Sequence, residues 1–220
     1  MQKRLQHKQS FFFEQEEYQN IHLHPVCGID EAGRGPLAGP LSIALVQFSK
    51  EALNLIFERK ILVDLNDSKK LSEKKRDSLF HEISLNAEKI VHQFISNNFI
   101  DKHGMSYSIF YGIQKLYKKS GLRNSLFLID GNYKFTKYEG VENSFRYHSF
   151  IKGDSRIASI AAASIIAKVK RDRFMNSISK KYPEYEFEKH KGYGTSTHLQ
   201  KIQEFGYSKI HRKSFIIKKF

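Results

Sequence analysis

The chain has 220 residues, 40% of them apolar and 13% aromatic, which is enough to bury one good core with a small accessory element and predicts a soluble globular protein. Its 37 Lys and Arg residues outnumber its 23 Asp and Glu residues, and the resulting formal charge of +14 favours a polyanionic partner, nucleic acid first of all. The single cysteine, Cys27, excludes a disulfide framework and a cysteine metal cluster, and no apolar run approaches the roughly 20 residues of a membrane span, so we expect a cytoplasmic protein with no membrane partner.

The first 24 residues are rich in Gln, His, Lys and Glu and show no clear periodicity, so we treat residues 1–24 as an N-terminal extension to the fold. Within it, residues 9–13 (QSFFF) loosely resemble the short peptides of glutamine and aromatic residues that dock on replication sliding clamps. A chance match and a packed arm are the alternatives to clamp binding.

The first two strands are predicted soon after the extension. Residues 26–29 form a short buried strand in which Cys27 is a small core residue, and residues 41–48 form a second strand. The glycines and Pro36 between them require a turn. Farther along, a helix should begin after Ser72, which is a good N-cap, and residues 90–95 should form another strand.

The second half of the core alternates helices and strands. Apolar residues at helical spacing predict a helix from Met105 that ends near Gly121. The apolar run that ends on an acid at 125–130 and the strand-like stretch 145–151 predict strands. Because residues 126–129 are apolar without interruption, we expect a sheet with parallel strands that is covered by helices on both faces. The strongest helical pattern spans residues 157–182.

The composition turns polar after Pro183, and a short helix is predicted over residues 197–205. We therefore expect a single core over residues 25–182 and a small helical C-terminal part over residues 183–220.

Four carboxylates end buried strands or precede the long helix: Asp30, Glu31, Asp130 and Asp154. One end of a sheet could bring them together, and oxygen ligands of this kind are preferred by Mg²⁺. Without a cation the four would repel one another, and some would hold a proton. Two ions about 4 Å apart could bridge a scissile phosphate, activating a water on one side and stabilising the leaving oxygen on the other.

The stretch that contains the acidic pair, residues 28–40 (GIDEAGRGPLAGP), resembles the signature of ribonuclease HII, and further matching motifs follow in the expected order. They are residues 66–72 (NDSKKLS), 129–131 (IDG), 152–154 (KGD), 161–169 (AAASIIAKV) with 171–172 (RD), 192–195 (GYGT) and 211–215 (HRKSF). The related ribonuclease HIII is a poorer match, since that group is expected to carry Val where this chain has Ala32, and a large N-terminal domain.

The resemblance implies an α/β, RNase H-like fold: a mixed central sheet flanked by helices, with a small helical C-terminal part. It implies that Asp30, Glu31, Asp130 and Asp154 are catalytic and ligate two Mg²⁺ or Mn²⁺ ions. It further implies an enzyme, expected to be a monomer, that takes part in ribonucleotide excision repair and DNA replication. Its substrates would be RNA–DNA hybrids and duplex DNA with an embedded ribonucleotide, cut on the 5′ side to leave 3′-hydroxyl and 5′-phosphate ends.

The resemblance also assigns substrate-binding residues. The family loop at Gly33, Arg34 and Gly35 reads the 2′-hydroxyl and adjacent phosphates, and Tyr193 matches the tyrosine that stacks on the sugar beside the cut. Three other residues fit phosphate contacts: Ser68, Lys69 and Lys168. With Lys168, Arg171 and Arg173 are expected to form a basic edge along the long helix.

The remaining polar residues have simpler interpretations. Asp67 is expected to cap a turn, and Asp172 to pair with a neighbouring cation. The histidines lack ligand spacing, so His190 and His211 are read as structural or phosphate-facing. Two other functions stay open: another RNase H-like nuclease, which should lack the glycine–arginine loop and Tyr193, and a non-catalytic nucleic-acid-binding protein.

Overall fold

The computed structural model describes residues 25–135, 138 and 145–215, so the clamp-like segment 9–13 lies outside the described residues. Its centre is a five-stranded mixed sheet in the order β3-β2-β1-β4-β5. β1 pairs antiparallel with β2 and parallel with β4, β2 pairs antiparallel with β3, and β4 pairs parallel with β5. The strands are β1 (Val26–Ala32), β2 (Leu41–Gln47), β3 (Lys89–Ile95), β4 (Leu126–Asp130) and β5 (Arg146–Phe150).

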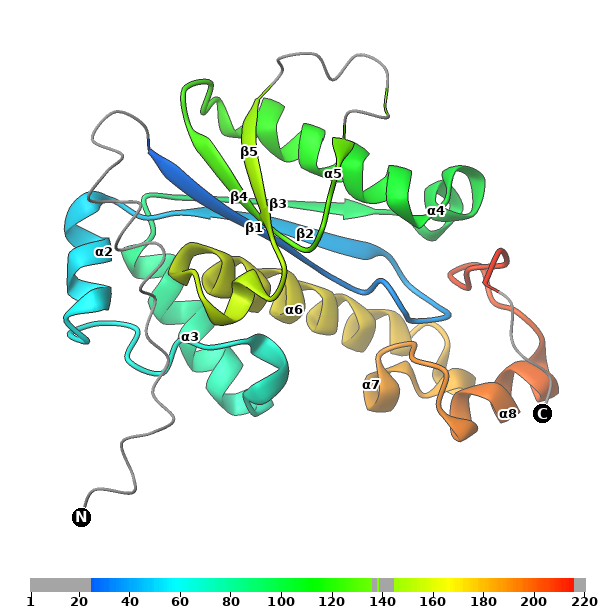
Figure 1. Ribbon diagram of the computed structural model, residues 1–220. Coiled ribbons are helices and arrows are strands. Elements are labelled where there is room, and N and C mark those ends of the chain that lie inside the picture. Colours follow the sequence, from blue (N-terminus) through cyan, green and yellow to red (C-terminus); the bar gives the residue numbers. More distant parts are fainter. Residues whose placement is uncertain (1–24, 136–137, 139–144, 216–220) are drawn as a thin grey trace.

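Helices cover both faces of the sheet, as the apolar strand pattern predicts (Figure 1). One face is covered by α6 with α2 and α3, and the other by α5 with α4. The helices are α2 (Lys50–Phe57), α3 (Glu73–Asn86), α4 (Asn97–His103), α5 (Met105–Ser120), α6 (Ala158–Ser179), α7 (Phe187–His190) and α8 (Ser196–Phe205). The α/β fold with a mixed sheet is thus confirmed.

The structure confirms two predicted capping residues, one at the start of α3 and one at the end of α5. The Ser72 side chain caps α3 by accepting a hydrogen bond from the Lys75 N–H, and Gly121 ends α5 in the left-handed conformation at φ 69°. The short helices α2, α4 and α7 are not predicted, because eight residues or fewer give too little periodicity.

β1 is longer than predicted. It runs three residues past Ile29, because β2 turns back along it and keeps the pairing as far as Ala32 opposite Ser42. Asp30 and Glu31 therefore belong to the strand itself and, as successive residues, point to opposite faces of the sheet.

α6 packs closely against β1 through small residues. A Cβ on Gly28 would lie 2.1 Å from the carbonyl carbon of Ser159, so only glycine lets the strand and helix approach this far. Cys27 points the other way, into the core under α5, where it is fully buried as predicted.

The C-terminal helices pack against the loop that follows β1. Ala38 from that loop joins Met175 of α6 and three residues of the C-terminal part, Tyr185, Phe187 and Ile202, in one apolar cluster. Within the described ranges, none of the helices combines the length and the apolar character needed to cross a membrane.

Candidate active site

Three aspartates from separate parts of the chain meet at one end of the sheet. Asp30 lies on β1, Asp130 is the last residue of the neighbouring parallel strand β4, and Asp154 lies in a single helical turn between β5 and α6. Each offers one carboxylate oxygen, and these oxygens lie within 4.8 Å of one another. Parallel pairing of β1 with β4 explains why acids 100 residues apart in sequence become neighbours.

The surroundings of the aspartates disfavour their charge. Burial, followed by repulsion from Glu31 and Asp130, raises the pKa of Asp30 well above its usual value. Burial and the charge of Asp130 raise the pKa of Asp154 to about 6. The Lys69 ammonium lies 3.9 Å from Asp154 but is itself exposed to solvent. Closely spaced oxygen ligands with too little positive charge are the donor set that hard divalent cations prefer, so the residues fit a metal.

Glu31 lies beside this group on the other face of β1. Its Oε1 accepts a hydrogen bond from the Tyr133 hydroxyl at 3.1 Å and faces the Arg34 guanidinium at 3.5 Å. Its Oε2 is buried and has no hydrogen-bond partner among the described residues. Burial raises the pKa of Glu31 to about 7, although Arg34 and Tyr133 oppose the shift. An unpartnered buried carboxylate oxygen next to three aspartates is a further observation that fits a cation.

Backbone N–H groups hold two of the carboxylates in place. The N–H of Glu31 donates to Asp30 Oδ1 and the N–H of Gly153 donates to Asp130 Oδ1, both at 2.7 Å. Gly153 is a tight fit, because a Cβ there would meet the Ile160 side chain at 2.7 Å. These contacts orient the carboxylates without neutralising them.

The glycine–arginine loop leaves β1 directly after the acidic pair. Gly33 has φ +98°, a conformation that glycine adopts readily, and a Cβ there would lie 2.2 Å from Arg171 Nε. Gly35 is open, with nothing within 4 Å of the place where a Cβ would stand. The Arg34 side chain is 57% exposed, so the loop presents a cation to solvent beside Glu31.

The Tyr193 turn lies next to this loop. The Leu37 N–H donates to the carbonyl of Gly192 at 2.8 Å, which links the two segments directly. Tyr193 is 45% exposed, and its ring lies over the Arg171 guanidinium at 6.0 Å. The structure therefore brings the glycine loop and the tyrosine together at one surface.

The loop before α3 approaches the same carboxylates. Asp67 caps its single helical turn by accepting from the Lys69 N–H, which confirms the expected cap. Ser68 is buried and accepts a hydrogen bond from the Ser164 hydroxyl of α6 at 2.7 Å. Of this loop's predicted phosphate contacts, Lys69 is therefore the exposed one.

The predicted basic edge of α6 is only partly present. Lys168 is paired with Asp172 at 2.7 Å, which confirms the expected pairing, and Arg173 reaches Asp77 of α3. Arg171 does not belong to this edge, because it is fully buried and donates to backbone carbonyls. Its side of the helix is covered by the loop after β1 and by the C-terminal part.

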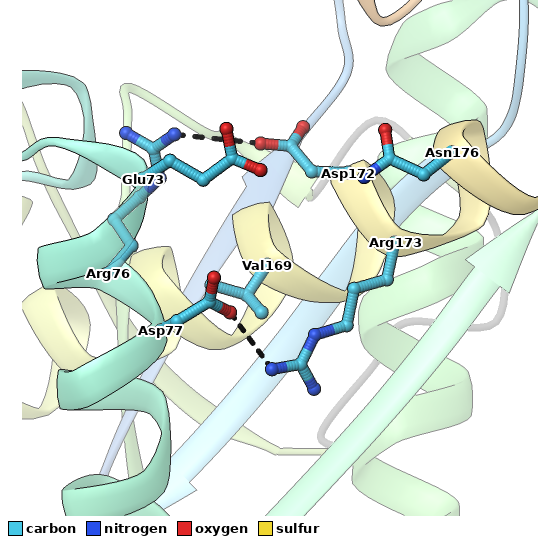
Figure 2. A pocket seen from close by; sticks show the side chains of 7 residues that line it. All are labelled: Glu73, Arg76, Asp77, Val169, Asp172, Arg173 and Asn176. Atoms are coloured by element: carbon cyan, nitrogen blue, oxygen red, sulfur yellow. Dashed lines mark hydrogen bonds and ion pairs between the residues drawn. The ribbon is translucent and has the colours of Figure 1, made fainter. Parts of the chain in front are cut away.

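A small charged cavity lies between α3 and α6 beside this edge (Figure 2). Its volume is about 90 Å³, and two ion pairs cross its rim, Arg76 with Asp172 at 3.7 Å and Arg173 with Asp77 at 2.9 Å. Binding pockets for small ligands usually measure about 300 Å³ or more. The cavity is therefore too small for a nucleotide.

Comparison with known proteins decides the family. A family model described as Ribonuclease HII matches residues 27–218. The chain belongs to the ribonuclease HII family. This makes it a type 2 ribonuclease H, a hydrolase.

Similar proteins agree in sequence and in fold. A ribonuclease HII from Aliarcobacter butzleri is 45% identical over 193 residues, covering 88% of this chain and 91% of that one. Ribonuclease HII in the solved PCNA complex from Archaeoglobus fulgidus superposes with a TM-score of 0.71 at 22% identity, covering 89% and 97% of the two chains. Bst-RNase HIII in complex with Mn²⁺ superposes with a TM-score of 0.66 at 19% identity, covering 87% and 67%.

Three residues reach the site through the fold, although no sequence motif predicts their contacts there. Tyr133 contacts Glu31, and the buried guanidinium groups of Arg171 and Arg212 lie beneath the glycine loop. Arg212 stands in the matching motif 211–215, which marks the position without revealing its contacts. His190 and His211 are buried and bonded to neighbouring groups, so the structural interpretation holds for both.

Proposed function

We propose that this member of the ribonuclease HII family is an endonuclease that cleaves the RNA strand of RNA–DNA hybrids and cuts duplex DNA 5′ of a single embedded ribonucleotide, leaving 3′-hydroxyl and 5′-phosphate ends. One observation carries the proposal: the carboxylate group lies beside the exposed glycine–arginine loop, which is itself bonded to the Tyr193 turn. The carboxylates that would hydrolyse the phosphate thus lie next to the loop and the tyrosine that would contact the ribose.

Two divalent ions, Mg²⁺ or Mn²⁺, would be held by Asp30, Glu31, Asp130 and Asp154. When bound, they would supply an activated water and offset the negative charge that develops on the scissile phosphate. The close aspartate oxygens and the unpartnered Glu31 Oε2 support this assignment. The Bst-RNase HIII neighbour, which shares the fold, was solved with Mn²⁺.

The remaining residues would bind and orient the duplex. Gly33, Arg34 and Gly35 would contact the 2′-hydroxyl and the adjacent phosphate, since a glycine backbone can approach a sugar closely and a guanidinium fits a phosphate. Tyr193 would stack on the sugar next to the cut. Phosphates farther along would meet the side chains of Lys69 and Lys168. Ser68, which is buried and bonded to Ser164, would hold the loop against α6 instead of contacting phosphate.

The deciding experiment compares matched duplexes that are all DNA, all RNA, hybrid, or DNA with one ribonucleotide, each with Mg²⁺, with Mn²⁺ and with chelator. We expect metal-dependent cutting of the hybrid and of the single-ribonucleotide duplex, and no cutting by Asp130→Asn. Equal cutting of the all-DNA duplex, or cutting by Asp130→Asn in chelator, would contradict the proposal. Binding without any cleavage would favour the non-catalytic alternative.

A second experiment tests the tyrosine. Tyr193→Ala should reduce cleavage at a single ribonucleotide more than it reduces duplex binding, because stacking beside the cut aligns the phosphate. An equal loss in both would show that Tyr193 only packs.

Recruitment by a sliding clamp is the partner proposal. The structural neighbour from Archaeoglobus fulgidus was solved with PCNA, and residues 9–13 of this chain loosely resemble a clamp-docking peptide. A clamp pulldown should lose the enzyme when residues 1–20 are deleted, and unchanged capture would remove the proposal. We also propose that residues 25–182 form the catalytic core and that residues 183–220 form a substrate-binding part. The enzyme would act in ribonucleotide repair in the cytoplasm.

A further inference from the structure

Arg212 is fully buried beneath the glycine–arginine loop, where its guanidinium donates to backbone carbonyls and lies over the Phe215 ring at 5.1 Å. Its guanidinium donates to Gly33 O at 2.7 Å, to Arg34 O at 3.1 Å and to Gly39 O at 2.9 Å. Among the described residues no carboxylate forms an ion pair with it. Burying an unpaired guanidinium is costly, and burial lowers the pKa of Arg212 to about 9. The three hydrogen bonds to carbonyls offset part of this cost.

Arg171 offers a close comparison within the same chain. It is also buried and also donates three hydrogen bonds to carbonyls, those of Ala38, Pro40 and Lys191, at 2.9 to 3.0 Å. The two arginines therefore make the same kind of contact with the same segment. They differ in what they reach beyond it: Arg212 donates to the carbonyls of Gly33 and Arg34, whereas Arg171 donates to the carbonyl of Lys191 and lies against the Tyr193 ring.

The hydrogen bonds from Arg212 also set the direction of the N–H groups of Arg34 and Gly35. In a trans peptide the C=O and the following N–H point in opposite directions, and the described chain contains no cis peptide. Arg212 draws the carbonyls of Gly33 and Arg34 inward, so the N–H groups of Arg34 and Gly35 point away from it. Neither N–H group has a hydrogen-bond partner in the described part of the chain. Two outward, unpaired N–H groups can bind a hydroxyl oxygen or a phosphate.

We propose that Arg212 is a positioning residue for substrate selection: it fixes the two peptide groups with which the glycine loop recognises the 2′-hydroxyl. The inference rests on the proposed function. A loop with a glycine on each side of Arg34 can adopt many backbone conformations. No neighbouring atom lies within 4 Å of the place where a Cβ on Gly35 would stand, so packing does not hold the loop at that residue. A planar guanidinium holds two successive carbonyls at once, whereas a lysine ammonium is a single point charge on a flexible stem.

The test compares Arg212→Lys with the matched control Arg171→Lys. For each, kcat/KM is measured on a duplex with one ribonucleotide and on the same duplex with a 2′-fluoro nucleotide at that site, in Mg²⁺. Fluorine is a weak acceptor and no donor, so the ratio of the two values measures recognition of the hydroxyl. We expect Arg212→Lys to lower this ratio by about tenfold, which corresponds to about 1.4 kcal/mol, and Arg171→Lys to leave it within about twofold of the wild-type ratio.

A purely structural role would slow both substrates equally and leave the ratio unchanged in Arg212→Lys, which would overturn the proposal. Arg212→Gln is the second variant, since it keeps a planar N–H donor without a buried charge, and the same fall is expected. Failure of both Arg212 variants to fold, while Arg171→Lys folds, would also overturn it. A wild-type enzyme that cuts no ribonucleotide-containing duplex would instead contradict the proposed function, and this inference with it.

Discussion

Gly28→Ala would push β1 and α6 apart at the point where the active site depends on their spacing. The added Cβ would lie 2.1 Å from the carbonyl carbon of Ser159 and 2.3 Å from the nitrogen of Ile160. Carbon atoms in good contact are roughly 3.5 Å apart, so strand and helix would have to separate by more than about one ångström. Both obstructing groups are backbone, and no change of side-chain rotamer can relieve the clash.

The expected cost follows from that displacement. Overpacking in cores typically costs about 1–3 kcal/mol, and a clash with backbone on both sides should reach the upper end. Asp30 lies two residues along β1, and Asp154 lies just before α6, so their separation changes with the spacing of strand and helix. A misplacement of about 1 Å can reduce a rate by about 10²-fold, and we expect that loss in kcat.

Urea unfolding and initial cleavage rates measure the two effects. Gly35→Ala is the control for the exchange of glycine for alanine, because its Cβ meets nothing within 4 Å and its φ is not left-handed, so its unfolding midpoint should equal that of the wild type. A Gly28→Ala enzyme with wild-type midpoint and rate would refute the reasoning.

Three other predictions follow from described contacts. Tyr133→Phe removes the hydroxyl that donates to Glu31, so it should raise the Mg²⁺ concentration for half-maximal activity several-fold. The free energy of unfolding should change by about 1 kcal/mol or less. An unchanged Mg²⁺ titration would contradict a role of this hydrogen bond in metal binding. Gly35→Ala, although neutral for stability, should lower kcat/KM on a single-ribonucleotide duplex, and an unchanged value would remove Gly35 from the recognition surface. Burial lowers the pKa of His198 and His211 to about 4, so their neutral forms stabilise the fold fully above about pH 6.5, and this is lost as the pH falls toward about 4. The difference in unfolding free energy between wild type and His211→Gln should therefore shrink from pH 7 to about pH 4.5, by up to about 3 kcal/mol, and a constant difference would contradict it.

The sequence alone predicts the mixed sheet and predicts that acidic residues lie at the ends of its strands. Asp130 ends a wholly apolar run, and such runs become parallel strands whose ends share one edge. It was less informative about strand length: β1 extends past Ile29 because β2 folds back on it, and pairing between strands is not visible in a local pattern.

Local sequence patterns do not predict contacts between segments that are far apart in the chain. Arg171 has the spacing of a surface cation on α6, and only the packing of the C-terminal part against that helix buries it. Tyr133 is an ordinary loop tyrosine until the fold places its hydroxyl 3.1 Å from Glu31. Charge and periodicity predict the helix or strand in which a residue lies. The burial of Arg171 and the hydrogen bond of Tyr133 depend instead on which other segment packs against them.

The bonds from Arg212 to the glycine loop also bear on how the protein is made. They join residues up to 179 positions apart, and the bridge between Ala38 and His211 closes the same long loop. Domains form progressively during synthesis, and contacts of such long range are made late. All four carboxylates precede Arg212 in the chain, so each is synthesised before the residue that holds the carbonyls of Gly33 and Arg34. The conformation of this loop therefore depends on a part of the chain that is made after the carboxylates.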